Sequence, residues 1–121
     1  MRALSIGGLR ITDFSIISSL TNLEFLHSDS GTLRDISIFS ELDNLIELNI
    51  SHCHVTKIEP LKNLGNLQEL WIYGSDISDF EKLLDFEHLK VLLVDDEMYK
   101  DYTDIIDALV EKGCNVKCNI F

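Results

Sequence analysis

Apolar residues return along this chain at a fixed interval of 22 residues. The clearest series is the leucine at the fourth position of each interval: Leu4, Leu26, Leu48, Leu70 and Leu92. Two residues further on, the series reads Ile6, Ser28, Ile50, Ile72 and Val94, so a serine interrupts it once. A period of this length, kept over several copies, predicts a solenoid in which each repeat buries its apolar side chains against its neighbours.

Each repeat opens with a short stretch in which apolar and polar residues alternate, which is typical of a strand with one buried face. We therefore expect strands near Ala3–Gly7, Phe25–Asp29, Glu47–Ser51, Glu69–Tyr73 and Val91–Asp95. In the third repeat, the alternation turns Leu48 and Ile50 toward the core. It turns Glu47, Asn49 and Ser51 outward.

Between the strands, each repeat carries a residue that can cap a short helical return. The expected N-caps are Asp13, Asp35, Thr56, Ser78 and Thr103. Ser78 and Glu81 fit the S-x-x-E pattern of a capping box. Pro60 fits only a first helical turn, which predicts a short or 3₁₀ return there, whereas Ser78–Leu89 is expected to be more helical.

The last repeat changes character. Tyr102–Lys112 predicts a longer amphipathic helix that Gly113 closes, and Val116–Ile120 predicts a sixth strand. Together they fit a C-terminal cap over the last open core face. No equivalent cap precedes Met1, so we expect the first strand to be an exposed edge. A partner at that edge (including self-association), an upstream segment and a distorted first repeat are three open explanations.

The strand and turn of the third repeat read LIELNISHCHV, from Leu45 to Val55, and fit the pattern L-x-x-L-x-L-x-x-N/C-x-L. This pattern resembles the leucine-rich repeat family, in the 22-residue form of bacterial, internalin-like proteins. The resemblance covers nearly the whole chain. It implies an α/β solenoid, an open right-handed horseshoe fragment with a parallel sheet on the concave side and short helices or 3₁₀ turns on the convex side.

Two departures from the family pattern modify this expectation. At the asparagine/cysteine position only Cys53 conforms, so no continuous asparagine ladder is expected. Ser28 occupies an apolar position, which predicts that the second repeat is the least regular. The chain is interpreted as one domain, residues 1–121, with repeats 1–22, 23–44, 45–66, 67–88 and 89–110 and a cap at 102–121.

Charge and hydropathy restrict the function classes. Ten Lys and Arg residues against 21 Asp and Glu residues give a net charge of −11, which argues against nucleic acid and favours a basic partner or simply high solubility. No apolar run of 18 residues predicts a membrane span. Because the first repeat starts without a leader, we expect a cytoplasmic location, unless the chain is a piece of an exported protein.

Few residues are candidates for a metal site, a disulfide or a catalytic site. His52, Cys53 and His54 form the tightest cluster of potential metal ligands, but alternation turns Cys53 inward and the histidines outward. Cys114 and Cys118 would lie about 13 Å apart along a strand, too far for a disulfide. We therefore expect three reduced thiols, no metal, no cofactor and no catalytic residues. An enzyme with an unrecognised carboxylate site is the least favoured class.

The outward strand positions carry aromatic residues that the repeat pattern does not require. The resemblance implies that these positions line the concave face, where most family members bind protein. The candidate partner-binding residues are Phe25, His27, Asp29, Glu47, Asn49, Glu69, Trp71, Tyr73, Leu93 and Asp95. Trp and Tyr are over-represented among binding hot spots, which favours a binding role. The alternative is that Trp71 only packs over neighbouring aliphatic stems.

Two hypotheses for function follow. The first is a non-enzymatic interaction module that binds a basic protein on its concave face, in a narrower form an immunity or inhibitor protein that neutralises a toxin or nuclease. The alternative is a structural or adhesive repeat fragment of a larger scaffold or surface protein.

Overall fold

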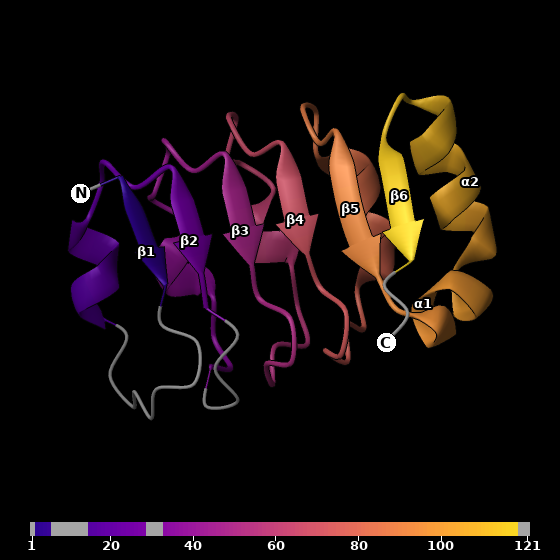
Figure 1. The fold of residues 1–121 in the computed structure, drawn as a ribbon, viewed down its shortest axis with the longest axis horizontal. Helices are drawn as coiled ribbons and strands as arrows, with labels where there is room; N and C mark the ends of the chain where they lie inside the picture. The colour runs from indigo at the N-terminus through magenta and orange to yellow at the C-terminus, as the bar shows by residue number, and fades with distance from the viewer. Residues whose placement is uncertain (1, 6–14, 29–32, 119–121) are drawn as a thin grey trace.

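The structure, a computed structural model, describes residues 2–5, 15–28 and 33–118. Its main layer is a six-stranded parallel sheet whose strands follow one another in chain order. The strands are β1 (Ala3–Ser5), β2 (Phe25–His27), β3 (Glu47–Asn49), β4 (Glu69–Trp71), β5 (Val91–Val94) and β6 (Asn115–Cys118). Figure 1 shows them side by side, with the helices in a second layer behind them. The predicted open solenoid is confirmed, with strands shorter than expected.

The register of the sheet explains the 22-residue period. From β1 to β5, each residue pairs with the residue 22 positions later, so Leu4, Leu26 and Leu48 lie in one row. Leu70 and Leu92 continue the row. Leu26, Leu48, Leu70 and Leu92 are completely buried. The fourth position of each repeat therefore forms one continuous inner row, which is the inward face that alternation predicted.

Short helices form the second layer. They are the 3₁₀ helices η1 (Ser15–Ser19), η2 (Ser37–Phe39), η3 (Glu59–Leu61) and η4 (Phe80–Asp85), followed by α1 (Asp96–Asp101) and α2 (Thr103–Glu111). Pro60 lies in the first turn of η3, as predicted. The return Ser78–Leu89 holds η4, which is longer than η3 but is a 3₁₀ helix rather than an α-helix.

The C-terminal elements agree with the predicted cap. Helix α2 lies one residue inside the predicted bounds at each end, and Gly113 follows it in the left-handed conformation, with φ of 98°. Ile106 and Leu109 of α2 are buried in the core. The ring of Tyr102 stacks on Phe80 of η4, with ring centroids 4.3 Å apart. Helix α1 was not predicted from the sequence. Ile120, at the end of the predicted sixth strand, lies outside the described residues.

The capping predictions for the central returns are wrong. Ser78 does not cap η4, because its hydroxyl donates instead to the carbonyl of Thr56 at 3.0 Å. Thr56 does not cap η3 either. The cap of η3 comes from the next repeat: the buried carboxylate of Asp79 accepts hydrogen bonds from the backbone N–H groups of Ile58 and Glu59, at 2.9 and 3.0 Å.

The other predicted caps have mixed outcomes. Asp35 is not the N-cap of η2, because Ile36 occupies that position without a side-chain cap bond. Asp35 does accept a hydrogen bond from the backbone N–H of Ser37 at 2.9 Å, and hydrogen bonding to the side chain and the backbone of Ser37 lowers the pKa of its carboxyl group. Thr103 does not cap α2, since its hydroxyl donates back to the carbonyl of Tyr99 at 3.0 Å. Asp13 lies outside the described residues.

The turns after β3 and β4 are joined by a short ladder of polar side chains. Cys53 is buried, as predicted, and its Sγ contacts the carbonyl oxygen of Ser28 at 2.8 Å. Ser75, one repeat later, donates to the carbonyl of Ile50 at 2.9 Å. Ser75 also accepts from the N–H of Cys53 at 3.3 Å. Ser75 and Cys53 thus make equivalent contacts, each with a backbone carbonyl of the preceding repeat.

The second repeat carries one unsatisfied group among the described residues. Ser28 is completely buried in the apolar row that also holds Ile50 and Ile72, and its hydroxyl has no hydrogen-bond partner. Residues 29–32 of this repeat lie outside the described residues, so the expectation that the second repeat is the least regular stays a prediction.

Candidate functional site

The candidate site is built on the sheet surface that faces away from the 3₁₀ helices, called here the sheet face. The register lines up two rows of outward residues across the strands, as predicted. The first row is Ala3, Phe25, Glu47, Glu69, Val91 and Asn115, and the second is Ser5, His27, Asn49, Trp71, Leu93 and Lys117. Asn115 and Lys117 extend the rows onto β6. The expected sixth strand, Val116–Ile120, included Lys117 but began one residue after Asn115. The same alternation predicts a third outward row, of which Gly7 and Asp29 lie outside the described residues. Its other members are Ser51, Tyr73 and Asp95.

An aromatic stack crosses the sheet face. The ring of Trp71 lies 5.2 Å from that of His27 and 6.5 Å from that of Tyr73, measured between centroids. The ring of His52 meets Tyr73 edge-on at 5.2 Å. Of the two histidines in this stack, His27 was among the candidate residues but its ring contact with Trp71 was not predicted, and His52 was not a candidate. The 22-residue register places His27 and Trp71 in the same row, two strands apart. This alignment could have predicted the contact between their rings.

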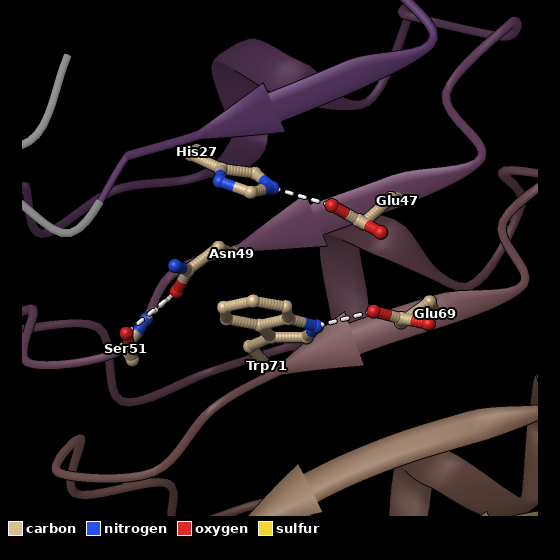
Figure 2. A network of polar contacts seen from close by, with 6 residues as sticks. All are labelled: His27, Glu47, Asn49, Ser51, Glu69 and Trp71. Atoms are coloured by element: carbon tan, nitrogen blue, oxygen red, sulfur yellow. Dashed lines mark hydrogen bonds and ion pairs between the residues drawn. The ribbon is translucent and has the colours of Figure 1, made fainter. Parts of the chain in front are cut away.

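Asn49 and Ser51 do not lie on the surface as predicted. They are 5% and 1% exposed. Asn49 lies between His27 and Trp71 in the register, and Figure 2 shows it between their two rings. Because these large side chains lean toward each other over the middle strand, the outward residue of β3 is covered. The Asn49 Oδ1 atom accepts hydrogen bonds from the N–H and the hydroxyl of Ser51, at 2.9 and 2.5 Å.

Two carboxylates stand beside the aromatic stack. Glu47 pairs through Oε2 with the Nε2 atom of His27, and Glu69 accepts through Oε2 from the indole N–H of Trp71 at 2.6 Å (Figure 2). Glu47 and Glu69 are direct partners in the sheet register. Like charges directly opposite one another destabilise a sheet, so this arrangement costs the fold some stability.

Asp95 contributes to the fold rather than standing free on the sheet face. Its Oδ1 accepts from the N–H of Met98, which caps α1, and its Oδ2 accepts from the N–H of Gly74 at 2.8 Å. The partner-binding role predicted for Asp95 therefore competes with two structural hydrogen bonds. A substitution of Asp95 would disturb the turn and the helix together with any binding.

The β1–β2 end of the sheet face is apolar and hollowed. A depression of about 310 Å³ is lined by Ala3, Leu4, Ser5, Phe25 and His27. The Phe25 side chain is 36% exposed there, whereas Leu93, at the other end of the rows, is half-buried. The sheet face thus combines an apolar hollow, an aromatic stack and a pair of carboxylates.

The thiols lack the features of an activated nucleophile. The Cys118 Sγ donates to the Asp96 carboxylate at 2.9 Å, and this hydrogen bond raises the thiol pKa to about 11. Burial raises the pKa of the Cys114 thiol. Among the described residues, no group of three or more His, Cys, Asp or Glu side chains is arranged to hold a metal ion. In the same part of the chain, no helix has both the length and the apolar character needed to cross a membrane.

Comparison with known proteins agrees with this architecture. Residues 43–89 match the family model described as leucine-rich repeats in two copies. Among solved structures, the chain is similar to internalin C2 of Listeria monocytogenes, with a TM-score of 0.74 and 30% sequence identity over 79% of this chain and 42% of that one. It is also similar in fold to the internalin inlF of the same organism, with a TM-score of 0.75 and 21% identity over 97% of this chain and 34% of that one.

The matched repeats, the 22-residue register and these structural neighbours show that the chain is a leucine-rich repeat protein. It spans less than half the length of either internalin structure. No curated protein matches it. The class of protein is thereby defined as a leucine-rich repeat solenoid.

Proposed function

We propose that this chain binds a basic protein through its sheet face, with Trp71 and Tyr73 as anchors. The observation that carries the proposal is the aromatic stack beside two carboxylates on an otherwise regular sheet. Core packing does not require a tryptophan at an outward strand position. Large, partly exposed aromatic side chains supply much of the affinity at protein interfaces.

The charge of the chain supports a cationic partner. The net charge is −11, and Glu47 and Glu69 place two negative charges next to Trp71. Carboxylates at the rim of an interface accelerate association with a positively charged surface, and salt weakens this effect. In its narrower form, the proposal is an inhibitor or immunity protein that acts in the cytoplasm and covers the basic active surface of a toxin or nuclease, with no catalysis of its own.

A structural or adhesive role in a larger protein is the second candidate. The observation that favours it is that the chain covers only 42% and 34% of the two internalin structures to which it is similar. In that case the sheet face would be one segment of a longer binding surface, and the partner would contact neighbouring repeats as well. The two candidates differ in whether this chain alone is sufficient for tight binding.

The test compares three immobilised forms of the chain, wild type, Trp71→Ala and Val110→Ala, in a lysate of the native organism. Val110 is a control because it is 53% exposed and lies on α2, within the helical layer. Quantitative mass spectrometry should find a basic protein retained by wild type and by Val110→Ala, and depleted with Trp71→Ala. With that purified partner, Trp71→Ala should cost about 2 kcal/mol of binding, roughly a 30-fold loss of affinity.

Salt dependence completes the test. Raising the ionic strength should slow association of the wild type more than that of Glu69→Gln, because the substitution removes one steering charge. Gln can still accept the hydrogen bond of the Trp71 indole. Equal affinity of the wild type and Trp71→Ala for every captured protein would move the binding surface away from the sheet face.

A further inference from the structure

We propose that the sheet face at β3 and β4 binds an arginine side chain of the partner, with the guanidinium group on the Trp71 indole and between the carboxylates of Glu47 and Glu69. This inference rests on the proposed function and specifies the chemical group that the site recognises. It is carried by the free carboxylate oxygens, the like charges that face each other across two strands, and the aromatic face.

Both carboxylates keep one oxygen atom available. Glu47 contacts His27 only through Oε2, and Glu69 contacts Trp71 only through Oε2. Among the described residues, neither Oε1 atom has a hydrogen-bond partner. The two residues are paired across adjacent strands, which lie about 4.8 Å apart in a sheet. The two oxygens therefore offer acceptors at a spacing that one branched cation can bridge.

A cation between these groups would remove an unfavourable interaction that the unbound protein carries. Glu47 and Glu69 have like charges at directly opposed sheet positions. Of the two, only Glu47 has a basic neighbour, His27, among the described residues, and no Lys or Arg pairs with either. A bound cation would offset the repulsion between Glu47 and Glu69. Binding of a positive charge is therefore expected to stabilise the folded protein.

Asn49 holds the middle strand beneath this arrangement. Its side chain is only 5% exposed, and its Oδ1 accepts two hydrogen bonds from Ser51. Figure 2 shows its amide group turned toward Ser51, on the side away from Glu47 and Glu69. The two carboxylates and the Trp71 ring therefore make up the site without the Asn49 amide.

The geometry selects arginine over lysine. A guanidinium group is planar, stacks on an aromatic face and presents several N–H donors in a fork, so one group can contact an indole and two carboxylates at once. An ammonium group is compact and more strongly hydrated, and it would bind one carboxylate as a point charge. The stacked rings of Trp71 and Tyr73, tilted by 30° to each other, give the planar group the larger surface.

The chain contains a single tryptophan, so its fluorescence reports directly on this site. The probe is the tripeptide acetyl-Gly-Arg-Gly-amide, compared with the same peptide carrying lysine or citrulline in place of arginine. We expect a saturable change in Trp71 emission with a dissociation constant on the order of 1 mM for arginine. The lysine peptide should bind about fivefold more weakly, and the uncharged citrulline peptide should give no saturable change.

Variants separate this site from general attraction to an acidic protein. Glu47→Gln and Glu69→Gln should each weaken binding of the arginine peptide about tenfold, because each removes one charge-assisted contact. Glu111→Gln removes the same charge from the exposed end of α2 and should change the dissociation constant less than twofold. Circular dichroism confirms that each variant is folded.

Equal binding of the arginine and lysine peptides, or equal losses in Glu69→Gln and Glu111→Gln, would overturn the arginine site. These outcomes leave the proposed function in place if Trp71→Ala still loses the protein partner. The opposite result is also informative. If Trp71 fluorescence responds specifically to the arginine peptide but the capture experiment finds no protein that binds the sheet face, only the proposed function is contradicted. The peptide titration therefore tests the arginine site, and the partner capture separately tests the proposed function.

Discussion

Two buried serines show that the same side chain has opposite effects on stability at two positions. The Ser28 hydroxyl is buried without a partner, whereas the Ser75 hydroxyl bridges the carbonyl of Ile50 and the N–H of Cys53. Ser28→Ala should raise the free energy of unfolding by about 1 kcal/mol, because an unpaired polar group leaves the core. Ser75→Ala should lower it by about 1–3 kcal/mol, because two backbone groups lose their partner.

Chemical denaturation of both variants measures the two effects. Each substitution removes the same hydroxyl group, so each variant is the control for the other in side-chain size and helix or strand propensity. If Ser28→Ala destabilises the chain as much as Ser75→Ala, the Ser28 hydroxyl must be hydrogen-bonded in solution.

Residue orientation could be predicted from the sequence, but burial of the outward residues could not. Alternation correctly assigned Leu48 and Ile50 to the core. It also turned Asn49 outward, yet the rings of His27 and Trp71 from the two adjacent strands cover that residue. Accessibility depends on the size and rotamers of neighbours 22 residues away, which a pattern along one strand does not contain.

At the scale of elements, the strands were easier to predict than the caps. A strand is defined by apolar alternation within one repeat, whereas the returns are held by contacts between repeats. Asp79 caps η3 of the preceding repeat, and the amide group of Asn66 donates to the carbonyl of Asp43, 23 residues earlier, at 2.9 Å. The amide of Asn44 reaches Thr21 in the same way. The recurrence of Asn22, Asn44 and Asn66 at the repeat period was the signal for this ladder.

The role of Asp79 gives a prediction at this scale. Asp79→Ala should lower the free energy of unfolding by about 2–3 kcal/mol, because the N–H groups of Ile58 and Glu59 lose their side-chain acceptor at the start of η3. Asp76→Ala, an exposed carboxylate three residues earlier, is the matched control and should change stability by less than about 0.5 kcal/mol. Thermal melts followed by circular dichroism measure both. Equal melting temperatures of the two variants would show that Asp79 does not cap η3.

At the scale of the whole molecule, the period determines the architecture because it also sets the sheet register. Five strands at offsets of 22 residues follow from the leucine series alone. The interaction surface was predicted less completely. Trp71, Tyr73, Glu47 and Glu69 do gather on the sheet face, but the pairing of Glu47 with His27 and the structural bonds of Asp95 depend on side-chain rotamers that no periodicity encodes.

The continuous leucine row makes a final prediction about how stability is distributed. Leu70 is completely buried in the middle of the sheet, between Leu48 and Leu92, so Leu70→Ala should cost about 2–5 kcal/mol. Because each repeat packs only against its neighbours, the loss should spread to both sides, and amide exchange should accelerate in β3 and β5 as well as in β4. Leu93→Ala, on the sheet face of β5, removes the same atoms from a half-buried position and should cost about 1 kcal/mol or less. Denaturant midpoints with hydrogen exchange measure both variants. Equal destabilisation by the two substitutions, or exchange that changes in β4 alone, would mean that the leucine row does not couple the repeats.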